Sequence, residues 1–353
     1  MDYIETKTNE YLKELEENDQ QESDNEKVKH VKEKIERLKT SKIQYENFHK
    51  QLEETKEPQI SATDADARAL LVHGQVVEVA YNTQAAVDEK HKLVVATHTI
   101  NRNDRNALTD IATEAKENII SDGYTALVDK GYHNGREIQN TQNQCITTIV
   151  AIPEIVNSND KGTTKEYLVD KFIYHKESDT YTCPQDQTLS TKGTWHTKKR
   201  DETISYQYKK YRTPACKTCP VQQLCTAKAD GRREIERSEF AEAVETNKIN
   251  YLNNKDLYRK RQEINEHIFG TLKRQWNYYY TNLRGLEKVN GEMALIMTVY
   301  NLKRVHNILG IEKLLEKLKT WKPKYPKTSK LAKKRTLLRL YTKTYFESLS
   351  LAA

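Results

Sequence analysis

The chain has 353 residues, of which 36% are hydrophobic and 31% charged, with a net charge of +7 and a pI of about 8.8. At roughly 150 residues per domain, this length predicts about two domains, or one large domain with an insertion. No stretch approaches the roughly 18 apolar residues that a membrane span needs, and the charged N-terminus has no apolar signal core. We therefore expect a cytoplasmic protein, and its basic excess fits a polyanionic partner.

Residues 1–57 are predicted to form a long helix, because they are rich in Glu and Lys and almost free of Gly and Pro. Apolar residues recur there at a spacing of three to four, at Val28, Val31, Ile35, Leu38, Tyr45 and Leu52. Two interpretations of this seam remain open: a hairpin partner or weak coiled coil, or a solvated helix packed on the main domain. Pro58 ends the helical pattern.

After Pro58 the pattern changes to alternating strands and helices. The predicted strands are Gln59–Thr63, Val76–Val87, Lys92–Thr99, Tyr124–Val128 and Cys145–Ile152. The predicted helices between them are Asn106–Ile119 and Gly135–Gln142. This order predicts an α/β fold, with a mixed sheet and flanking helices, whose first part spans residues 58–152.

The rest of the chain divides into three further segments. Residues 153–250 are polar and carry four of the five Cys, which indicates an inserted, irregular β-type module. Residues 251–310 are predicted to be the helical second part of the core, with helices from about Asp256 to Leu309 and a buried face that includes Leu295, Ile296 and Val299. Residues 311–353 form a basic tail, which could be a DNA arm or a solvated segment.

Three acids are the candidate catalytic residues. Asp64 and Asp129 each follow a predicted strand, the place where α/β sheets put functional groups, although such acids are also common as caps and turn formers. Glu266 lies on a predicted helix with Lys273 seven residues later and Arg259 seven residues earlier on the same face. Three carboxylates from separate elements can hold two Mg²⁺ ions for an in-line phosphoryl displacement.

The cysteines suggest a second metal site. Cys216 and Cys219 form a C-x2-C pair, with Cys225 six residues later and Cys183 upstream, and four thiolates suit a structural Zn²⁺. His196 is a possible substitute ligand. The alternative is that these are reduced cysteines packed in a small core. Cys145, inside a predicted strand, is expected to be core.

Cations and aromatic rings alternate after the Glu266 helix. Lys273, Arg274, Trp276 and Tyr278–Tyr280 are followed by Arg284. Such a mixture suits contact with a nucleic-acid backbone and stacking on unpaired bases, whereas the alternative is that Trp276 and part of the Tyr run belong to the core.

The strings TDADAR, YNTQAAVD, LVDKGYH, EHIFGTLKR, LRGLEKV and YNLKR occur in this order over roughly residues 30–310. Together they resemble the DDE transposases of bacterial insertion sequences, in the branch with a cysteine-bearing insertion before the Glu helix. The resemblance implies an RNase H-like core that uses Mg²⁺ or Mn²⁺ to cut DNA at the element ends and to join the freed 3′-hydroxyl to target DNA. It also implies a nucleoid-associated protein and a homodimer.

By motif, Asp64 matches the first acid of that family, Asp129 the second and Glu266 the third, with Asp66 as the alternative first acid. An Arg is frequent four residues before the Glu in related families, but this position is Gln262 here, with Arg261 beside it.

The family's members usually carry a longer helical N-terminal region. Two alternatives of other classes therefore stay open: a truncated, inactive remnant that only binds DNA, and a zinc-organised interaction module.

Overall fold

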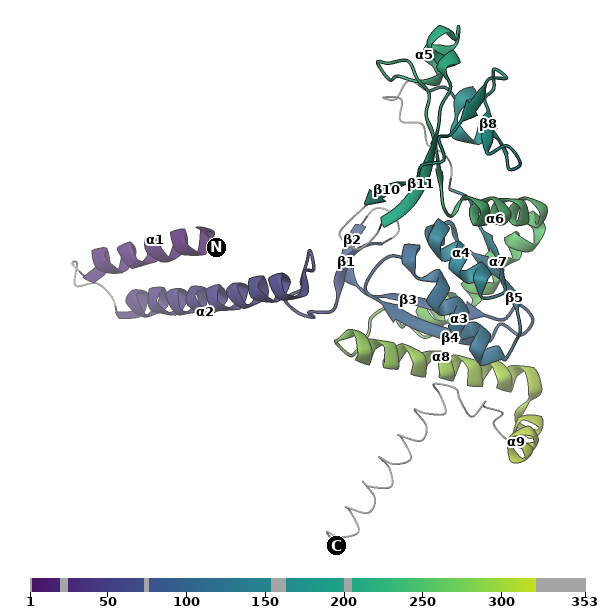
Figure 1. Ribbon diagram of the computed structural model, residues 1–353. Coiled ribbons are helices and arrows are strands. Elements are labelled where there is room, and N and C mark those ends of the chain that lie inside the picture. Colours follow the sequence, from purple (N-terminus) through teal and green to yellow (C-terminus); the bar gives the residue numbers. More distant parts are fainter. Residues whose placement is uncertain (1, 20–24, 73–75, 154–162, 200–204, 322–353) are drawn as a thin grey trace. The chain divides into compact units, whose positions relative to one another are not determined.

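The computed structural model describes residues 2–19, 25–72, 76–153, 163–199 and 205–321 (Figure 1). The chain divides into two compact units, Met1–Thr298 and Val299–Ala353. None of the helices in the described part of the chain is long and apolar enough to cross a membrane.

The N-terminal segment forms two helices rather than one, α1 (Asp2–Asp19) and α2 (Asn25–Thr55). They run in opposite directions, as two contacts between them show. Glu5 of α1 binds Lys42 of α2 at 2.9 Å, and the later Tyr11 of α1 lies beneath the ammonium group of the earlier Lys34 of α2. Among the described side chains of these helices, the buried apolar ones are Ile4, Val31 and Ile35. The pairing supports the hairpin interpretation, while the side chain of Val28 lies outside the described residues.

The predicted strand Gln59–Thr63 is wrong, because this segment is an irregular loop. The Ser61 hydroxyl lies 3.3 Å from the backbone N–H groups of Thr63 and Asp64 and accepts a hydrogen bond from each. Local bonds of this kind compete with a strand ladder. The first strands are instead an antiparallel hairpin of β1 (Arg68–Val72) and β2 (Val76–Ala80).

A second antiparallel hairpin follows, formed by β3 (Asn82–Val87) and β4 (Val94–Ile100). The predicted strand over 76–87 is therefore split at Tyr81. The Asp88 carboxylate closes the hairpin turn, because it accepts the N–H groups of His91 and Leu93 at 2.7 Å. The helix α3 (Leu108–Ile119) contacts this hairpin, and its buried residues are those of the predicted apolar face, Leu108, Ile111, Ala112 and Ala115.

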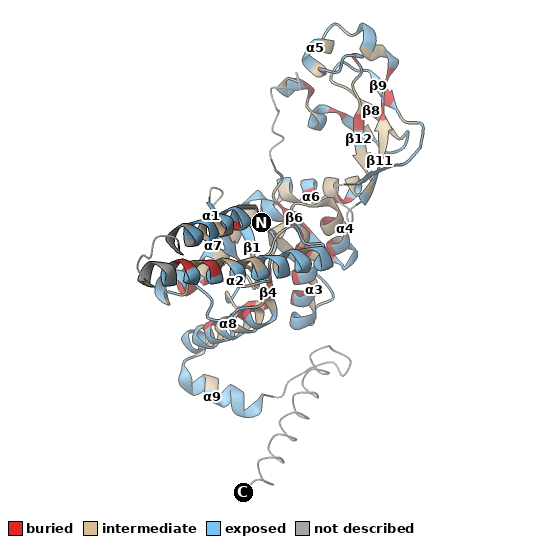
Figure 2. Cartoon of the chain, turned by 90° about the vertical axis from the view of Figure 1, so that its left-hand side faces the viewer, coloured by how far each residue is buried: buried red, intermediate tan, exposed pale blue. Residues whose placement is uncertain are grey.

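The next strands, β5 (Tyr124–Val128) and β6 (Ile146–Val150), pair in parallel and are joined by α4 (Gly135–Asn143). The ladders of this region are two separate pairs, β3–β4 and β5–β6. The helix α6 (Ala241–Asn253) covers β6, and the fully buried Asn247 bonds both the N–H and the carbonyl of Val150. Figure 2 shows buried residues gathered among α3, α4 and β6.

The predicted β-type insertion contains two small antiparallel sheets. One consists of β7 (Ile173–His175), β8 (Thr180–Thr182) and β9 (Thr188–Ser190), and the other of β10 (His196–Lys199), β11 (Ser205–Tyr211) and β12 (Ile235–Ser238). Their shared core is largely aromatic, with Phe172, Tyr181, Leu189, Tyr211 and Ile235 buried. Asp179 lies at its edge and accepts bonds from Lys209 at 2.7 Å and from the hydroxyls of Tyr174 and Tyr211.

Helices dominate the remainder, as predicted. They are α7 (Lys255–Gly270), the π-helical turn η7 (Thr271–Gln275), α8 (Leu286–Leu309) and α9 (Ile311–Thr320). The predicted core face of α8 is wrong for Leu295 and Val299, which are exposed. The buried stripe of this helix instead consists of Val289, Met293, Met297 and Tyr300. Residues 322–353, most of the predicted basic tail, lie outside the described residues.

We predict a pH-dependent role for Asp179 in the stability of the insertion. Burial raises the pKa of Asp179, but the bonds from Lys209, Tyr211 and Tyr174 outweigh it and lower this pKa to about 2. Replacement by Asn should lower the free energy of unfolding at pH 7 by about 1–2 kcal/mol, the low end for bonds to a charged group because the side chain is 35% exposed.

An acid whose pKa is lower in the folded than in the unfolded protein stabilises the fold at pH values above its unfolded-state pKa. This stabilisation is lost as the pH falls through the folded-state pKa. The difference between the parent and Asp179→Asn should therefore shrink from about pH 4 to about pH 2. Urea unfolding at several pH values measures it, with the exposed Glu177→Gln as the matched control. A difference that stays constant down to pH 2 would contradict this role.

Candidate active site

Asp64 lies in the loop between α2 and β1, where its carboxylate is held by several donors. Its Oδ2 accepts the hydroxyl of Tyr81 at 2.7 Å, and its two oxygens lie 3.2 and 3.1 Å from the backbone nitrogen of Gly285. Burial raises the pKa of Asp64, but the bonds from Tyr81, Gly285 and the Asp66 N–H outweigh it and leave this pKa below its usual value. Asp64 is thus a fixed, ionised carboxylate at neutral pH.

Asp66 makes a different contact with the same distant loop. Its Oδ2 accepts the N–H of Leu286 at 2.9 Å, at the first residue of α8. A carboxylate here satisfies one of the free N–H groups of the helix N-terminus, which is a structural role. Gly285, which donates to Asp64 and directly precedes Leu286, has a φ of +89°, a backbone conformation that favours glycine.

Asp129 directly follows β5, as predicted, and begins the short 3₁₀ turn η2 (Lys130–Tyr132). Its Oδ1 accepts the N–H of Lys130 at 2.7 Å, and half of its side chain is exposed. The guanidinium of Arg261 on α7 lies 3.7 Å away and also lies over the ring of Tyr258. Arg261 is therefore the helix residue that reaches the second predicted acid.

Glu266 also lies on α7. It is exposed, it is two residues from each of the buried Ile264 and Ile268, and its Oε1 accepts the Gln262 side chain at 2.8 Å. Residues two apart on a helix do not share a face. Glu266 therefore lies on a different face of α7 from the buried Ile264 and Ile268.

The helix that carries Glu266 changes character before it reaches Lys273. The α-helix ends at Gly270, and Thr271–Gln275 form a π-helical turn in which the Trp276 N–H reaches the Thr271 carbonyl at 3.0 Å. A π-turn contains more residues than an α-turn, so Lys273 is shifted around the axis from the position that a continuous α-helix would give it. Lys273 itself is exposed.

Within the described ranges, no group of three or more His, Cys, Asp or Glu side chains is arranged to hold a metal ion. The three predicted acids therefore do not form one metal-binding group among the described residues, and each accepts hydrogen bonds of its own. Asp64 and Asp129 are nevertheless linked through a fourth acid, Asp104, which the sequence analysis missed. Asp104 starts the turn η1 (Asp104–Asn106) between β4 and α3, and its position in the string NRNDRN is typical of an ordinary turn.

The predicted DNA-contacting residues are mostly accessible. Arg259, Lys273, Arg274 and Arg284 are exposed, while Trp276 is half-buried. Arg284 donates to the Thr63 carbonyl at 3.2 Å, beside Asp64. Tyr278, in the loop before α8, has a structural role, because its hydroxyl bonds Glu292 of α8. Tyr280 is 87% exposed and is the ring of this run most accessible to a partner.

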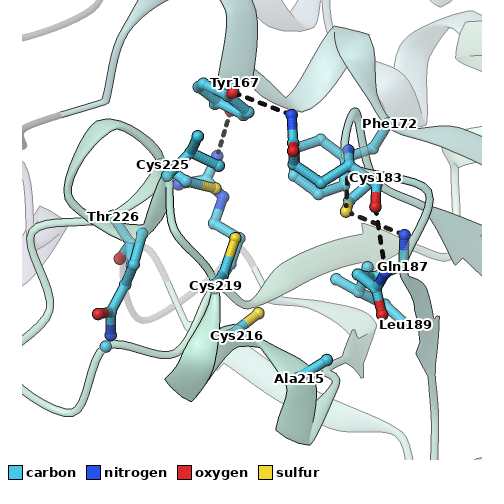
Figure 3. Close-up of a pocket in the computed structure, with 15 residues that line it drawn as sticks. Tyr167, Phe172, Cys183, Gln187, Leu189, Ala215, Cys216, Cys219, Cys225 and Thr226 are labelled. Carbon is cyan, nitrogen blue, oxygen red and sulfur yellow. Dashed lines mark hydrogen bonds between the residues drawn. The ribbon is translucent and has the colours of Figure 1, made fainter.

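Four cysteines line one pocket of the insertion, formed by Cys183 after β8, Cys216 and Cys219 in and after the turn η6 (Pro214–Thr218), and Cys225 in α5 (Gln222–Cys225) (Figure 3). Burial raises the pKa of the Cys225 thiol, and the three other thiols raise it further, although Arg233 opposes them. His196 is not among the pocket-lining residues. Cys145 is exposed and precedes β6, so its predicted place in the core is wrong.

Comparison with known proteins gives one match. Residues 182–306, about a third of the chain, match the family model described as a transposase DDE domain. The match supports a DDE transposase and includes the cysteines, α7 and the helix α8 as far as His306. No curated protein and no solved structure matches the chain.

We predict that Tyr81→Phe will raise the pKa of Asp64 toward its usual value, because the hydroxyl that stabilises the carboxylate is removed. The free energy of unfolding at pH 7 should fall by about 1–2 kcal/mol. A carboxyl-carbon NMR titration measures the pKa, with the exposed Tyr279→Phe as control. An Asp64 titration that is the same in the parent and in Tyr81→Phe would show that this bond does not set the pKa.

Proposed function

We propose that this protein is an insertion-sequence transposase that cuts DNA strands and transfers them with a DDE triad. The match of residues 182–306 to a transposase DDE domain carries the proposal, because it includes the string EHIFGTLKR with Glu266. Asp129 after β5 and Asp64 beside Tyr81 supply the two other acids in the order that the resemblance implies. The RNase H-like character of the core is part of this proposal.

The residues divide into three chemical roles in this proposal. Asp64, Asp129 and Glu266 are the metal-binding carboxylates, and their oxygen donors suit Mg²⁺ or Mn²⁺. Such ions stabilise the attacking and leaving oxygens of a phosphodiester when bound. Because the three carboxylates are not grouped within the described residues, we assign them no coordination geometry.

The exposed cations provide the second role, and the rings provide the third. Arg259, Lys273, Arg274 and Arg284 neutralise DNA phosphates in this proposal, and binding should weaken with salt accordingly. Tyr280 and Trp276 offer ring faces for unpaired bases near a cut. The substrates are the ends of the element and a target DNA, and the attacking groups are water and then the freed 3′-hydroxyl.

We further propose that Cys183, Cys216, Cys219 and Cys225 hold a structural Zn²⁺. The support is that all four thiols line one pocket although Cys183 is 33 or more residues from the others. Against this stands the arrangement of the thiols, which does not form a metal-binding group among the described residues. A bound Zn²⁺ would add folding free energy to a module with few buried apolar side chains.

The transposase proposal is tested by strand cleavage of element-end DNA with Mg²⁺ or with EDTA. Glu266→Gln should lower the cleavage rate by about 100-fold or more, because it removes a metal-binding charge. Glu263→Gln, one turn away on the exposed side of α7, is the matched control and should cleave like the parent. DNA binding without any metal-dependent cleavage by the parent would favour the inactive remnant.

The zinc proposal is tested by metal analysis of the purified protein. The parent should contain about one zinc per chain, and Cys219→Ser should lose it together with thermal stability. Cys145→Ser, an exposed cysteine outside the pocket, should retain the metal. A zinc-free parent with the same melting temperature as Cys219→Ser would rule out a zinc site in this pocket.

A further inference from the structure

Asp104 occupies a node between the loops of the first and second predicted acids. Its Oδ1 accepts the side-chain N–H groups of Asn82 at 2.7 Å and Gln84 at 3.2 Å, both from β3. Tyr81, the residue before Asn82, is the one that donates to Asp64. Tyr81 and Asn82 are adjacent in sequence where β3 begins, and they bind Asp64 and Asp104, respectively.

The other side of Asp104 contacts the turn that carries Asp129. Tyr132, three residues after Asp129, lies near the same carboxylate: burial raises the pKa of the Tyr132 hydroxyl, and the negative charge of Asp104 raises it further. Gly131 lies so close that an added Cβ would stand 3.0 Å from Oδ2 of Asp104. A Cβ at this distance would require the Asp104 carboxylate to shift by a few tenths of an ångström.

Two more bonds hold the same pair of turns together. The Asn134 side chain donates to Asn106 at 2.6 Å, and the Glu137 carboxylate accepts the N–H of Thr109 at 2.9 Å. The segments around η1 and η2 are therefore joined by these two bonds and by the packing of Gly131 beside Asp104, which is the contact nearest Asp129 in sequence. Since no cation lies within salt-bridge distance of Asp104 among the described residues, uncharged donors hold its carboxylate.

We propose that Asp104 is a positioning residue that fixes the Asp129 turn relative to Asp64. Asn82 and Gln84 hold its Oδ1 from β3, and Gly131 of the Asp129 turn packs beside its Oδ2. Its role rests on the proposed function only in so far as Asp129 acts in DNA cleavage. The geometric part of the proposal concerns the turn alone.

The geometric part is tested without any activity measurement. The Lys130 N–H donates to Asp129 Oδ1, so its amide hydrogen exchange reports the conformation of the turn. Tyr132→Phe removes the hydroxyl that lies near Asp104, and Gly131→Ala adds a Cβ that crowds the Asp104 carboxylate. Both should accelerate Lys130 exchange by about tenfold, the factor expected for loss of one bond to a charged group.

Matched controls separate this effect from general destabilisation. Asp122→Asn removes an exposed acid from another turn, and Gly291→Ala adds a Cβ that meets no atom within 4 Å. Both controls should leave Lys130 exchange at the parent rate. Exchange unchanged in Tyr132→Phe and Gly131→Ala would overturn the proposal, whatever the activity of the protein.

The catalytic consequence is tested on the same variants. Tyr132→Phe and Asp104→Asn should lower kcat for strand cleavage by about 10–100-fold, with the KM for DNA unchanged and more Mn²⁺ needed for half activation. Cleavage at the parent rate, despite a loosened turn, would overturn the link to catalysis. If the parent does not cleave DNA while Lys130 exchange responds, the proposed function fails and the positioning role of Asp104 stands.

Discussion

The contact between the Asp64 carboxylate and the backbone of Gly285 is the constraint on which the candidate site depends. It joins two loops that are 221 residues apart, one before the first strands and one before α8. Asp66 and Leu286 form a second connection, two residues after Asp64 and one residue after Gly285. Because the donors are backbone N–H groups, the contact requires a particular backbone conformation, and the positive φ of Gly285 provides it. Asp64 and Asp66 thus join the loop before β1 to the start of α8. The bonds to Asp64 also keep the pKa of its carboxyl below the usual value.

Several parts of this arrangement could be predicted because local sequence determined them. The strand Tyr124–Val128 is a short apolar run that ends at a turn-forming Asp, so both its bounds and the place of Asp129 were predictable. The apolar spacing of α3 likewise gave its buried face, since a helix covering a hairpin needs one continuous stripe. The cysteines were assigned to one module because they cluster in the sequence, and the fold brings Cys183 to the same pocket.

Other parts depended on contacts that no local pattern contains. The segment 59–63 has strand-like residues but forms a loop, because Ser61 bonds the following backbone. Asp104 looks like an ordinary turn acid, and only the fold places it between Asn82 and Tyr132. The buried stripe of α8 was misplaced because that helix carries apolar residues on two faces, and Leu295 and Val299 belong to the exposed one. On α7, the side chain that reaches Asp129 is Arg261 and not Glu266, the acid of the motif.

The π-helical turn after α7 has a mechanical consequence for that acid. A π-turn holds one residue more than an α-turn, so its conversion to α-helix would rotate α7 by about 100° relative to the chain that follows. Glu266 is five residues from Arg261, which places it about 140° around the helix from the side chain that contacts Asp129. The bond from Trp276 to Thr271 closes this π-turn, so it fixes the direction of the exposed Lys273 and Arg274 relative to Glu266 on α7.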